Sequence, residues 1–327
     1  MRTLIVLCAG GRVINNLPVF LNRHPDGKIL AEKAIEGIFA ESYDEVIFTI
    51  LKSINDKYQV EKILNAEISG HNNIRIYELD KPTSGPAESV YLTIKGANIE
   101  GEFAVRDSLN GITISNKITG NFVAGLDLTK YEDDVFNVRS KSFIAINEQG
   151  QVLDVIEKRF RSDIISVGLY GFKKTSDYIM AYEKLNDINY PIVKMYLSNV
   201  ISYLIGYKQR VFHCASVSFH EDWGSPETWG RLQKKYATIF VDVDNLLGEC
   251  YRNILANMLI EKLSVFSNKK LCLVLFTRSI GIDKKHVYDM LDEINIHCID
   301  FICGVSHSTE QIMVSNNNEL QIAALGL

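Results

Sequence analysis

The stretch that decides the fold is Thr3-Leu4-Ile5-Val6-Leu7-Cys8-Ala9-Gly10-Gly11-Arg12. Its unbroken run of apolar residues is typical of a strand that is buried on both faces of a parallel sheet. The run ends in the small residues Ala9, Gly10 and Gly11, whose backbone N–H groups can approach a phosphate closely. Arg12 adds a guanidinium that can bind phosphate oxygens in pairs. The stretch therefore predicts a phosphate-binding turn, and the alternative is an ordinary tight turn after a buried strand.

Strand-like and helix-like segments alternate after this stretch. The expected strands are 45–51, 74–79 and 102–105, and the expected helices are 30–39, 58–68 and 86–99. This alternation predicts an open α/β sheet whose ligands bind beyond the carboxyl ends of its strands. Candidate segments at that edge are 10–12, 80–88, 106–110 and 222–227. Between residues 120 and 172, short alternating runs predict antiparallel strands laid across one side of the pocket.

Length and composition narrow the class of protein. A chain of 327 residues predicts two domains, which we place at 1–232 and 233–327. A formal net charge of −5 argues against a nucleic-acid partner. The six cysteines form no C-x-x-C pair, which favours free thiols in a reducing cytoplasm over a disulfide or zinc framework. With no membrane-spanning run and no cleavage site after the short N-terminal apolar run, we expect a soluble, cytoplasmic protein.

Five further segments have motif-like patterns of residues. They are Asp80-Lys81-Pro82-Thr83-Ser84-Gly85-Pro86-Ala87-Glu88, Arg106-Asp107-Ser108-Leu109-Asn110, Glu157-Lys158-Arg159-Phe160-Arg161, Val167-Gly168-Leu169-Tyr170-Gly171-Phe172 and Asp222-Trp223-Gly224-Ser225-Pro226-Glu227. Four of them have a structural alternative. The first and last read as helix starts, with Thr83 or Ser84 as the cap of the first helix. Asp107 reads as a loop cap, and the basic segment as a solvated sheet edge.

Taken together, these segments resemble a family. Residues 1 to about 230 are similar to nucleotidyltransferases of the sugar-phosphate pyrophosphorylase type, especially those of capsular and surface-polysaccharide clusters. The resemblance implies a glycosyltransferase-A-like fold, with a mixed, mainly parallel sheet flanked by helices. It also implies that a nucleoside monophosphate is joined to a sugar phosphate or similar phosphate monoester, with release of pyrophosphate. The reaction would be an in-line attack that depends mainly on positioning and charge neutralisation.

The resemblance assigns roles residue by residue. The nucleotide-binding residues would be Ala9, Gly10, Gly11, Arg12, Pro82, Thr83, Gly85, Ala87 and Glu88. The second substrate would contact Asn110, Glu157, Lys158 and Gly168. Asp107 and Asp222 would hold Mg²⁺, and the catalytic set would be Arg12, Lys28, Asp107, Lys158 and Asp222. Two departures bear on turnover: the loop is shortened to Ala9-Gly10-Gly11-Arg12, and Val19 replaces the lysine of a Pro-Lys pair, for which Lys28 or a residue of Lys158–Arg161 would have to substitute. Leu109 stands where some relatives carry a second acid.

The C-terminal segment has a resemblance of its own. The run Ala237–Asn245 ends in Asp242-Val243-Asp244 and is similar to the first motif of haloacid dehalogenase-like phosphatases, which have a small Rossmann-like fold. Asp242 would be the nucleophile, Asp244 the acid/base, and Thr277 would hold the phosphoryl group. The acidic fourth motif of that family appears as asparagines at 316–318. We therefore expect a degenerate module that serves dimerisation or a partner.

Three functional hypotheses follow. The first is the nucleotidyltransferase, the second is a catalytically impaired pseudoenzyme that binds a nucleotide or sugar phosphate, and the third is a bifunctional nucleotidyltransferase and phosphatase. The sequence leaves open the nucleobase, the second substrate and whether the chain forms a homo-oligomer.

Overall fold

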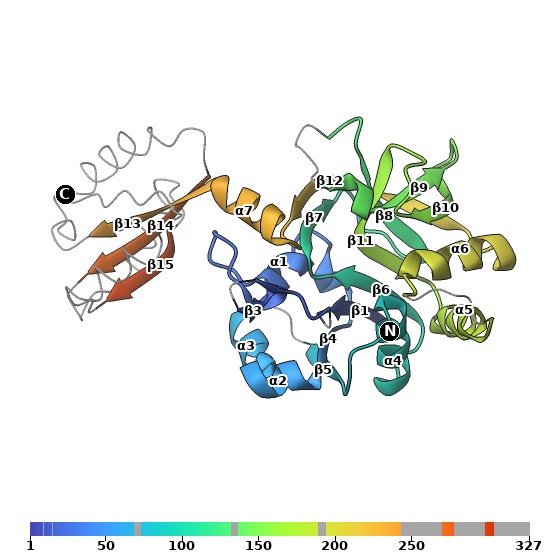
Figure 1. The fold of residues 1–327 in the computed structure, drawn as a ribbon, viewed down its shortest axis with the longest axis horizontal. Helices are drawn as coiled ribbons and strands as arrows, with labels where there is room; N and C mark the ends of the chain where they lie inside the picture. The colour runs from blue at the N-terminus through green and yellow to red at the C-terminus, as the bar shows by residue number, and fades with distance from the viewer. Residues whose placement is uncertain are drawn as a thin grey trace. The chain divides into compact units, whose positions relative to one another are not determined.

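The computed structural model describes residues 1–8, 10–14, 16–68, 73–131, 137–188, 194–242, 270–277 and 298–303 (Figure 1). The chain forms two compact units. The first contains Met1–Asn22 and Ile29–Ser225, and the second contains Arg23–Lys28 and the described residues from Pro226 onward. Helix α7 (Pro226–Lys234) belongs to the second unit and spans residue 232, after which we expected the domain boundary. That boundary stays a prediction.

The first half of unit 1 is a parallel sheet. Its strands are β1 (Arg2–Leu7), β4 (Glu45–Leu51), β5 (Ile74–Leu79) and β6 (Glu102–Asp107), in the order β5-β4-β1-β6. All three neighbouring pairs are parallel. Leu7 lies opposite Asp107, so the segments that follow β1 and β6 begin side by side at the carboxyl edge.

The sheet continues with strands of mixed direction. Beyond β6 come β11 (Ile164–Phe172), β8 (Phe122–Asp127), β12 (Phe212–Asp222), β10 (Gln151–Glu157) and β9 (Ser142–Ile146). β11 is antiparallel to both β6 and β8, and β9 and β10 form an antiparallel pair. The expectation of antiparallel strands between residues 120 and 172 is confirmed. β7 (Asn110–Ile114) pairs with the last part of β12, and β2 (Val13–Ile14) and β3 (Leu17–Pro18) form a small separate hairpin.

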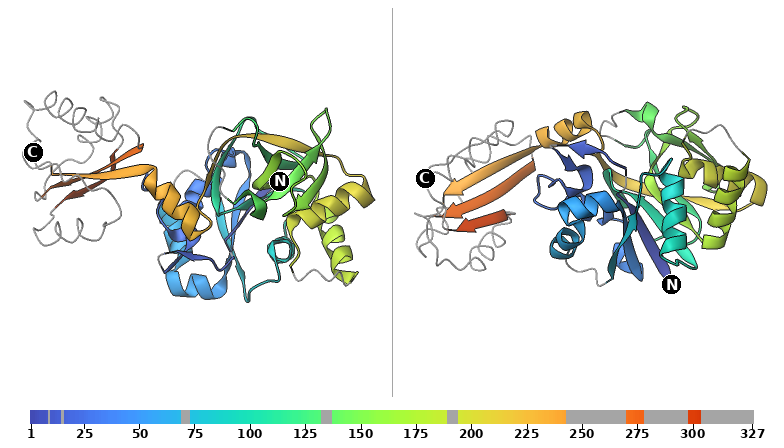
Figure 2. Two further views of the ribbon diagram at one scale, coloured as in Figure 1. Left: turned by 45° about the horizontal axis from the view of Figure 1, so that its top comes forward. Right: turned by 60° about the horizontal axis from the view of Figure 1, so that its bottom comes forward.

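Helices cover both faces of this sheet. The helices of unit 1 are α1 (Leu30–Ile35), α2 (Lys52–Tyr58), α3 (Val60–Glu67), α4 (Pro86–Gly96), α5 (Thr175–Asp187) and α6 (Leu197–Lys208). Three short 3₁₀ turns, η1 (Val19–Leu21), η2 (Ala40–Ser42) and η3 (Val138–Ser140), complete the described elements of this unit. Figures 1 and 2 show α2 and α3 (light blue) apart from α5 and α6 (yellow-green), with sheet strands between them.

Successive side chains of β1 point to opposite faces of the sheet and pack in two separate core clusters. Leu4 and Val6 pack in the cluster that contains residues of α1 and α3. Ile5 packs in the other cluster, with residues of α4, α5 and α6. All three side chains are fully buried, as the unbroken apolar run predicts for a strand covered on both faces.

The structure differs from the sequence pattern where α1 ends. The pattern predicts a helix to residue 39, but α1 ends at Ile35. Gly37 follows with φ of +70°, and its carbonyl accepts a hydrogen bond from the Ile114 N–H at 2.9 Å. A Cβ at Gly37 would lie 2.6 Å from the Ile112 carbonyl oxygen. The chain therefore leaves the helix early because close contact with β7 replaces further helical turns.

The second unit contains a parallel sheet. It consists of β13 (Tyr236–Asp242), β14 (Lys270–Thr277) and β15 (Cys298–Cys303), in that order. Asp242 and Thr277 are the last residues of neighbouring parallel strands, while Asp244 lies outside the described residues. The haloacid dehalogenase-like assignment stays a prediction. Among the described residues of the whole chain, no helix is both long and apolar enough to span a bilayer.

Candidate active site

Asp107 lies at the carboxyl end of β6 in a half-buried position. Its Oδ1 accepts a hydrogen bond from the Leu109 N–H at 2.9 Å. Burial raises the pKa of this carboxyl, while the charges of Arg106, Lys141 and Arg12 and the Leu109 N–H act to lower it. The net effect is a raised pKa, because removing a carboxylate from water outweighs these attractions.

Asp222 ends β12 and lies opposite Asn110 of β7. Its Oδ1 accepts a hydrogen bond from the Gly224 N–H at 2.9 Å, and its Oδ2 lies 2.5 Å from the Lys141 Nζ. Burial works against ionisation here too, but the charge and hydrogen bond of Lys141 outweigh it, so the pKa of Asp222 is lowered. The two carboxylates are thus tuned in opposite directions.

Trp223 joins the two acidic segments. Its backbone N–H donates to the Leu109 carbonyl at 3.2 Å, and its indole Nε1–H donates to the Ser108 carbonyl at 2.9 Å. The side chain is fully buried. A Cβ at Gly111 would lie 2.9 Å from the indole ring, so the glycine leaves room for it. Both carboxylates have Lys141 as a neighbouring charge. This arrangement agrees with the expectation that Asp107 and Asp222, from distant segments, come to one place.

Arg12 lies beside the same segment. Its Nη1 donates to the Gly224 carbonyl at 2.7 Å, and a Cβ at Gly224 would lie 3.2 Å from that nitrogen and 3.4 Å from the Asp222 Oδ1. In the turn before Arg12, a Cβ added at Gly10 or at Gly11 would have no described heavy atom within 4 Å. The turn is therefore open on its outer side, as a phosphate-binding turn requires. Ala9 lies outside the described residues.

Arg106 is a buried cation that sequence reasoning did not single out as functional. Its side chain has no exposed surface. Nε donates to the Ala34 carbonyl at 2.7 Å, Nη1 to the carbonyls of Val167 and Gly168, and Nη2 to the carbonyl and side-chain oxygens of Asn110. Burial lowers the pKa of this guanidinium to about 10. Arg106 therefore ties α1, β11 and the segment after β6 together directly behind Asp107.

Two residues expected to contact the second substrate have other roles in this structure. The side-chain oxygen of Asn110, which is 3% exposed, accepts from Arg106 at 3.0 Å. Gly168 has φ of +79°, and a Cβ there would lie 2.7 Å from the Asp107 Cβ. The Asp107 side chain therefore packs closely against Gly168, and the close approach of a sugar to Gly168 stays a prediction.

The segment expected to recognise the base is held in place by its own side chains. Thr83 Oγ1 lies 2.7 Å from Ser89 Oγ. The Glu88 Oε2 accepts from the Ser84 N–H at 2.5 Å. The N-cap of helix α4 is Gly85, with no side-chain cap hydrogen bond, so the alternative that Thr83 or Ser84 caps the helix is wrong. Glu88 instead closes the turn at the helix start, where its negative charge is favourable.

Gly85 and Ala87 pack against the segment that precedes α6. A Cβ at Gly85 would lie 2.5 Å from the Met195 carbonyl oxygen, and the Ala87 N–H donates to the same oxygen at 3.3 Å. Ala87 is fully buried. These two residues therefore support the turn from behind, while Pro82 is exposed and Thr83 is half-buried.

Glu157 and Lys158 occupy the end of β10. The Glu157 Oε2 accepts hydrogen bonds from the Ser142 hydroxyl at 2.5 Å and the Ser198 hydroxyl at 2.9 Å. Lys158 has φ of +52°, which turns the chain sharply after the strand. Its Nζ donates to the Tyr196 hydroxyl at 2.6 Å and lies 4.4 Å from the centroid of the Tyr196 ring.

Sequence reasoning missed Lys194 and Tyr196. The Lys194 Nζ lies 5.3 Å from the same Tyr196 ring centroid, so one aromatic ring attracts two ammonium groups. Lys158 and Lys194 are 36 positions apart in the printed sequence, and no local pattern links them. Together they form a cationic pair suited to an anion such as a phosphate monoester.

The position where the resemblance requires a lysine, Val19, and the lysine named as its possible substitute, Lys28, both lie within the described residues. Val19 is 2% exposed in η1, where it serves as an apolar core residue. Lys28 belongs to the second unit, in a turn where its N–H donates to the Asp26 Oδ1 at 3.2 Å and its carbonyl accepts from the His24 N–H. A catalytic role of Lys28 stays a prediction.

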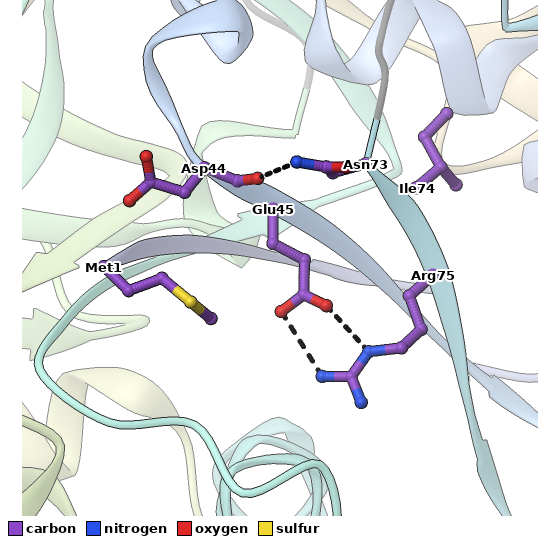
Figure 3. A pocket seen from close by; sticks show the side chains of 6 residues that line it. All are labelled: Met1, Asp44, Glu45, Asn73, Ile74 and Arg75. Atoms are coloured by element: carbon purple, nitrogen blue, oxygen red, sulfur yellow. Dashed lines mark hydrogen bonds and ion pairs between the residues drawn. The ribbon is translucent and has the colours of Figure 1, made fainter.

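A pocket of about 330 Å³ lies at the opposite edge of the sheet, near the amino ends of β1, β4 and β5. Its lining residues are Met1, Asp44, Glu45, Asn73, Ile74 and Arg75. Figure 3 shows its polar groups paired with one another: Arg75 with Glu45, the closest N–O distance being 2.8 Å, and the Asn73 amide with the Asp44 carbonyl at 2.7 Å. The pocket contains none of the residues expected from the sequence to bind or react.

This fold is similar to that of solved nucleotidyltransferases. The chain is similar to the nucleoside-diphosphate-sugar pyrophosphorylase from Vibrio cholerae RC9, with a TM-score of 0.57, 18% identity, and 70% of this chain and 98% of that chain covered. It is also similar to the inositol-1-phosphate CTP transferase from T. maritima, with a TM-score of 0.53, 15% identity, and coverage of 70% and 91%. A third is the CTP:phosphocholine cytidylyltransferase (LicC) from Streptococcus pneumoniae, with a TM-score of 0.52, 16% identity, and coverage of 71% and 98%.

The sequence itself matches no protein-family model and no curated protein. At these identities the likeness to solved structures shows a shared fold. The expected α/β class, with a large mixed sheet flanked by helices, is thereby confirmed for the N-terminal part of the chain.

Proposed function

We propose that unit 1 is a nucleotidyltransferase that joins the nucleoside monophosphate part of a nucleoside triphosphate to a sugar phosphate or a similar small phosphate monoester. The observation that carries this proposal is the meeting of Asp107 and Asp222 with Arg12 and Lys141 at the carboxyl edge of the sheet. This edge is where ligands of open α/β sheets bind. The fold shared with pyrophosphorylases and cytidylyltransferases supports the same reaction class.

The proposed reaction is a single displacement at phosphorus. An oxygen of the monoester forms a bond to the α-phosphorus, and the bond from that phosphorus to the bridging oxygen of the β-phosphate breaks. The bonding electron pair leaves with pyrophosphate, so the attacking monoester, as a dianion, needs no proton transfer. Positioning two anions in line and screening their charge is then the main task of the protein.

The donor set fits a magnesium ion that is shared with the substrate. The described residues contain no group of three or more His, Cys, Asp or Glu side chains suited to holding a metal by themselves. Mg²⁺ commonly takes one or two carboxylates and completes its shell with phosphate oxygens and water. Asp107 and Asp222 would supply the carboxylates, and the bound ion would neutralise charge on the triphosphate.

The cationic pair of Lys158 and Lys194 is the proposed site for the phosphate of the second substrate. The two ammonium groups lie 4.4 and 5.3 Å from the centroid of the Tyr196 ring. The neighbouring Glu157 is held by two serine hydroxyls and would accept hydrogen bonds from substrate hydroxyl groups. The role in surface-polysaccharide synthesis that the sequence resemblance suggests stays a prediction.

Pyrophosphate release from a panel of triphosphates and phosphate monoesters tests the proposal. We expect at least one pair to react, and the variant Asp107→Asn to lose activity by about 10²-fold or more, because one carboxylate no longer orients the reacting phosphates. Asp127→Asn is the matched control, since Asp127 also ends a strand of the same sheet but is bonded to Thr129. Release by no pair, or equal loss in both variants, would contradict the proposal.

Val19 favours a second candidate, a pseudoenzyme that binds these ligands without turnover. A buried apolar residue stands where the resemblance requires a lysine. This candidate predicts that nucleotides raise the melting temperature of the protein while no pyrophosphate forms. Robust release would exclude it.

The phosphatase hypothesis concerns unit 2 alone. Asp242 and Thr277 end adjacent parallel strands, which is the placement that the resemblance requires of them. A phosphatase assay that compares the wild type with Asp242→Asn tests it, and equal rates would remove it.

A further inference from the structure

Lys141 is a charged residue that no sequence motif singles out. It lies between η3 and the first residue of β9. Its Nζ is 2.5 Å from the Asp222 Oδ2, and the two side chains are only 18% and 16% exposed. One ammonium group is therefore paired with a carboxylate of the candidate site.

The place of Lys141 in the fold is informative. The next residue, Ser142, lies opposite Glu157 in the β9–β10 pair and donates to its carboxylate. Residues 141 and 142 thus stand between the carboxylate pair and the Glu157–Lys158 segment. Under the proposed function, the carboxylate pair binds the triphosphate, and the Glu157–Lys158 segment binds the attacking phosphate. An ammonium at this junction is placed where the two phosphates would meet.

The charges of the free site set up a competition. Lys141 makes a short ion pair with a carboxylate that is also a proposed ligand of a divalent cation. An ammonium and a divalent ion on the same oxygen repel each other, and the repulsion is strong in a site that is largely shielded from water. When the carboxylates hold a metal, the ammonium therefore has to move away. The phosphates bring the negative charge that would attract it.

We infer that Lys141 is a tethered cation with two positions. In the free protein it neutralises Asp222, and when the metal and triphosphate bind it turns to the phosphates and neutralises the charge that develops during transfer. This inference rests on the proposed function. It makes Lys141 a further catalytic residue, and it explains how unit 1 has an ammonium at the site although Val19 is apolar.

Two measurements on Lys141→Met test the inference. The first is a titration of the nucleotide-free protein with Mn²⁺, followed by electron paramagnetic resonance. We expect the variant to bind Mn²⁺ about tenfold more tightly, since a competing cation has been removed. The second is pyrophosphate release at saturating Mg²⁺, which we expect to fall by on the order of 10²-fold. Lys141→Arg should recover part of the release, because it keeps the positive charge.

Lys130→Met is the matched control. Lys130 pairs with Asp127 at 3.0 Å and is 82% exposed, so it is also a lysine–aspartate pair, but outside the site. We expect neither measurement to change in this variant. Tryptophan fluorescence before and after urea addition, which comes from the buried Trp223 and Trp229, verifies that each variant is folded.

The outcomes separate the two claims. Mn²⁺ affinity that is unchanged or weaker in Lys141→Met would show a purely structural ion pair and overturn the inference. Tighter Mn²⁺ binding with unchanged release would overturn the part played by Lys141 at the phosphates. If the wild type releases no pyrophosphate, the proposed function fails, and the Mn²⁺ affinities still decide whether Lys141 competes for the carboxylates.

Discussion

Replacing Gly168 by alanine tests whether the backbone of β11 fixes the position of the Asp107 carboxylate. Gly168 has φ of +79°, and an added Cβ would lie 2.7 Å from the Asp107 Cβ, against an ordinary contact of 3.4–4 Å. Neither atom is the end of a flexible side chain, so the contact can be relieved only by moving the backbone of β11 or of β6. We therefore expect both stability and activity to fall.

The structure sets the size of the effect. A side chain in the left-handed region costs roughly 1–2 kcal/mol. Forcing an extra carbon into a packed region costs about 1–3 kcal/mol more. Gly168→Ala should therefore lower the free energy of unfolding by about 2–5 kcal/mol, a large share of the roughly 5–15 kcal/mol typical of a domain. A displacement of Asp107 by about 1 Å would also reduce turnover by about 10²-fold.

Gly150→Ala separates the contact from the backbone strain. Gly150 has φ of +72°, and a Cβ there would have no described heavy atom within 4 Å. Gly150→Ala should therefore lose only the roughly 1–2 kcal/mol that a side chain in the left-handed region costs. Its turnover should not change. The chain has two tryptophans, so urea unfolding in a Trp229→Phe background lets the buried Trp223 report on unit 1 alone. Equal unfolding midpoints and equal turnover for the two alanine variants would refute the claim that Gly168 positions Asp107.

Two further predictions concern buried groups near the same site. Arg106→Met should destabilise the protein by about 3–5 kcal/mol in urea unfolding, because it leaves buried carbonyl groups without their donor. Arg75→Met, which removes a surface ion pair with Glu45, should cost less than about 1 kcal/mol. Similar losses in the two variants would mean that Arg106 is not a structural centre. Burial raises the pKa of the Cys8 thiol to about 12, so at pH 8 its thiolate is about a thousandfold rarer than for an ordinary thiol of pKa 9.0. We expect iodoacetamide to leave Cys8 unmodified in the folded protein and to modify it in urea, as read by peptide mass spectrometry, and rapid labelling of the folded protein would contradict this.

Much of the fold of unit 1 could be predicted from the sequence, because burial leaves a local pattern. The strands at Glu45–Leu51 and Ile74–Leu79 have the bounds that their apolar runs predict. The start of α4 at Pro86 also follows from its residues, since proline suits the first turn of a helix. Where long-range contacts intervene, the pattern fails: α1 stops at Ile35 because Gly37 turns to meet β7.

The carboxylates of the candidate site could be predicted in the same way. Asp107 and Asp222 each follow a run of strand residues, and strand ends gather at one edge of a sheet. What each neighbouring residue does could not be predicted. Asn110 and Gly168 have the types and positions of substrate-binding residues, yet the first binds Arg106 and the second packs against Asp107.

The sequence by itself determined that unit 1 is a layered α/β fold with acidic residues at its strand ends, because alternating burial and chain-breaking residues act over a few neighbours. Only the tertiary structure decided which charges meet. Lys141 reaches Asp222 across 81 positions, and Trp223 reaches Ser108 across 115. These contacts depend on the order and register of the strands, which arise from the packing of the whole sheet and leave no mark in any short stretch of sequence.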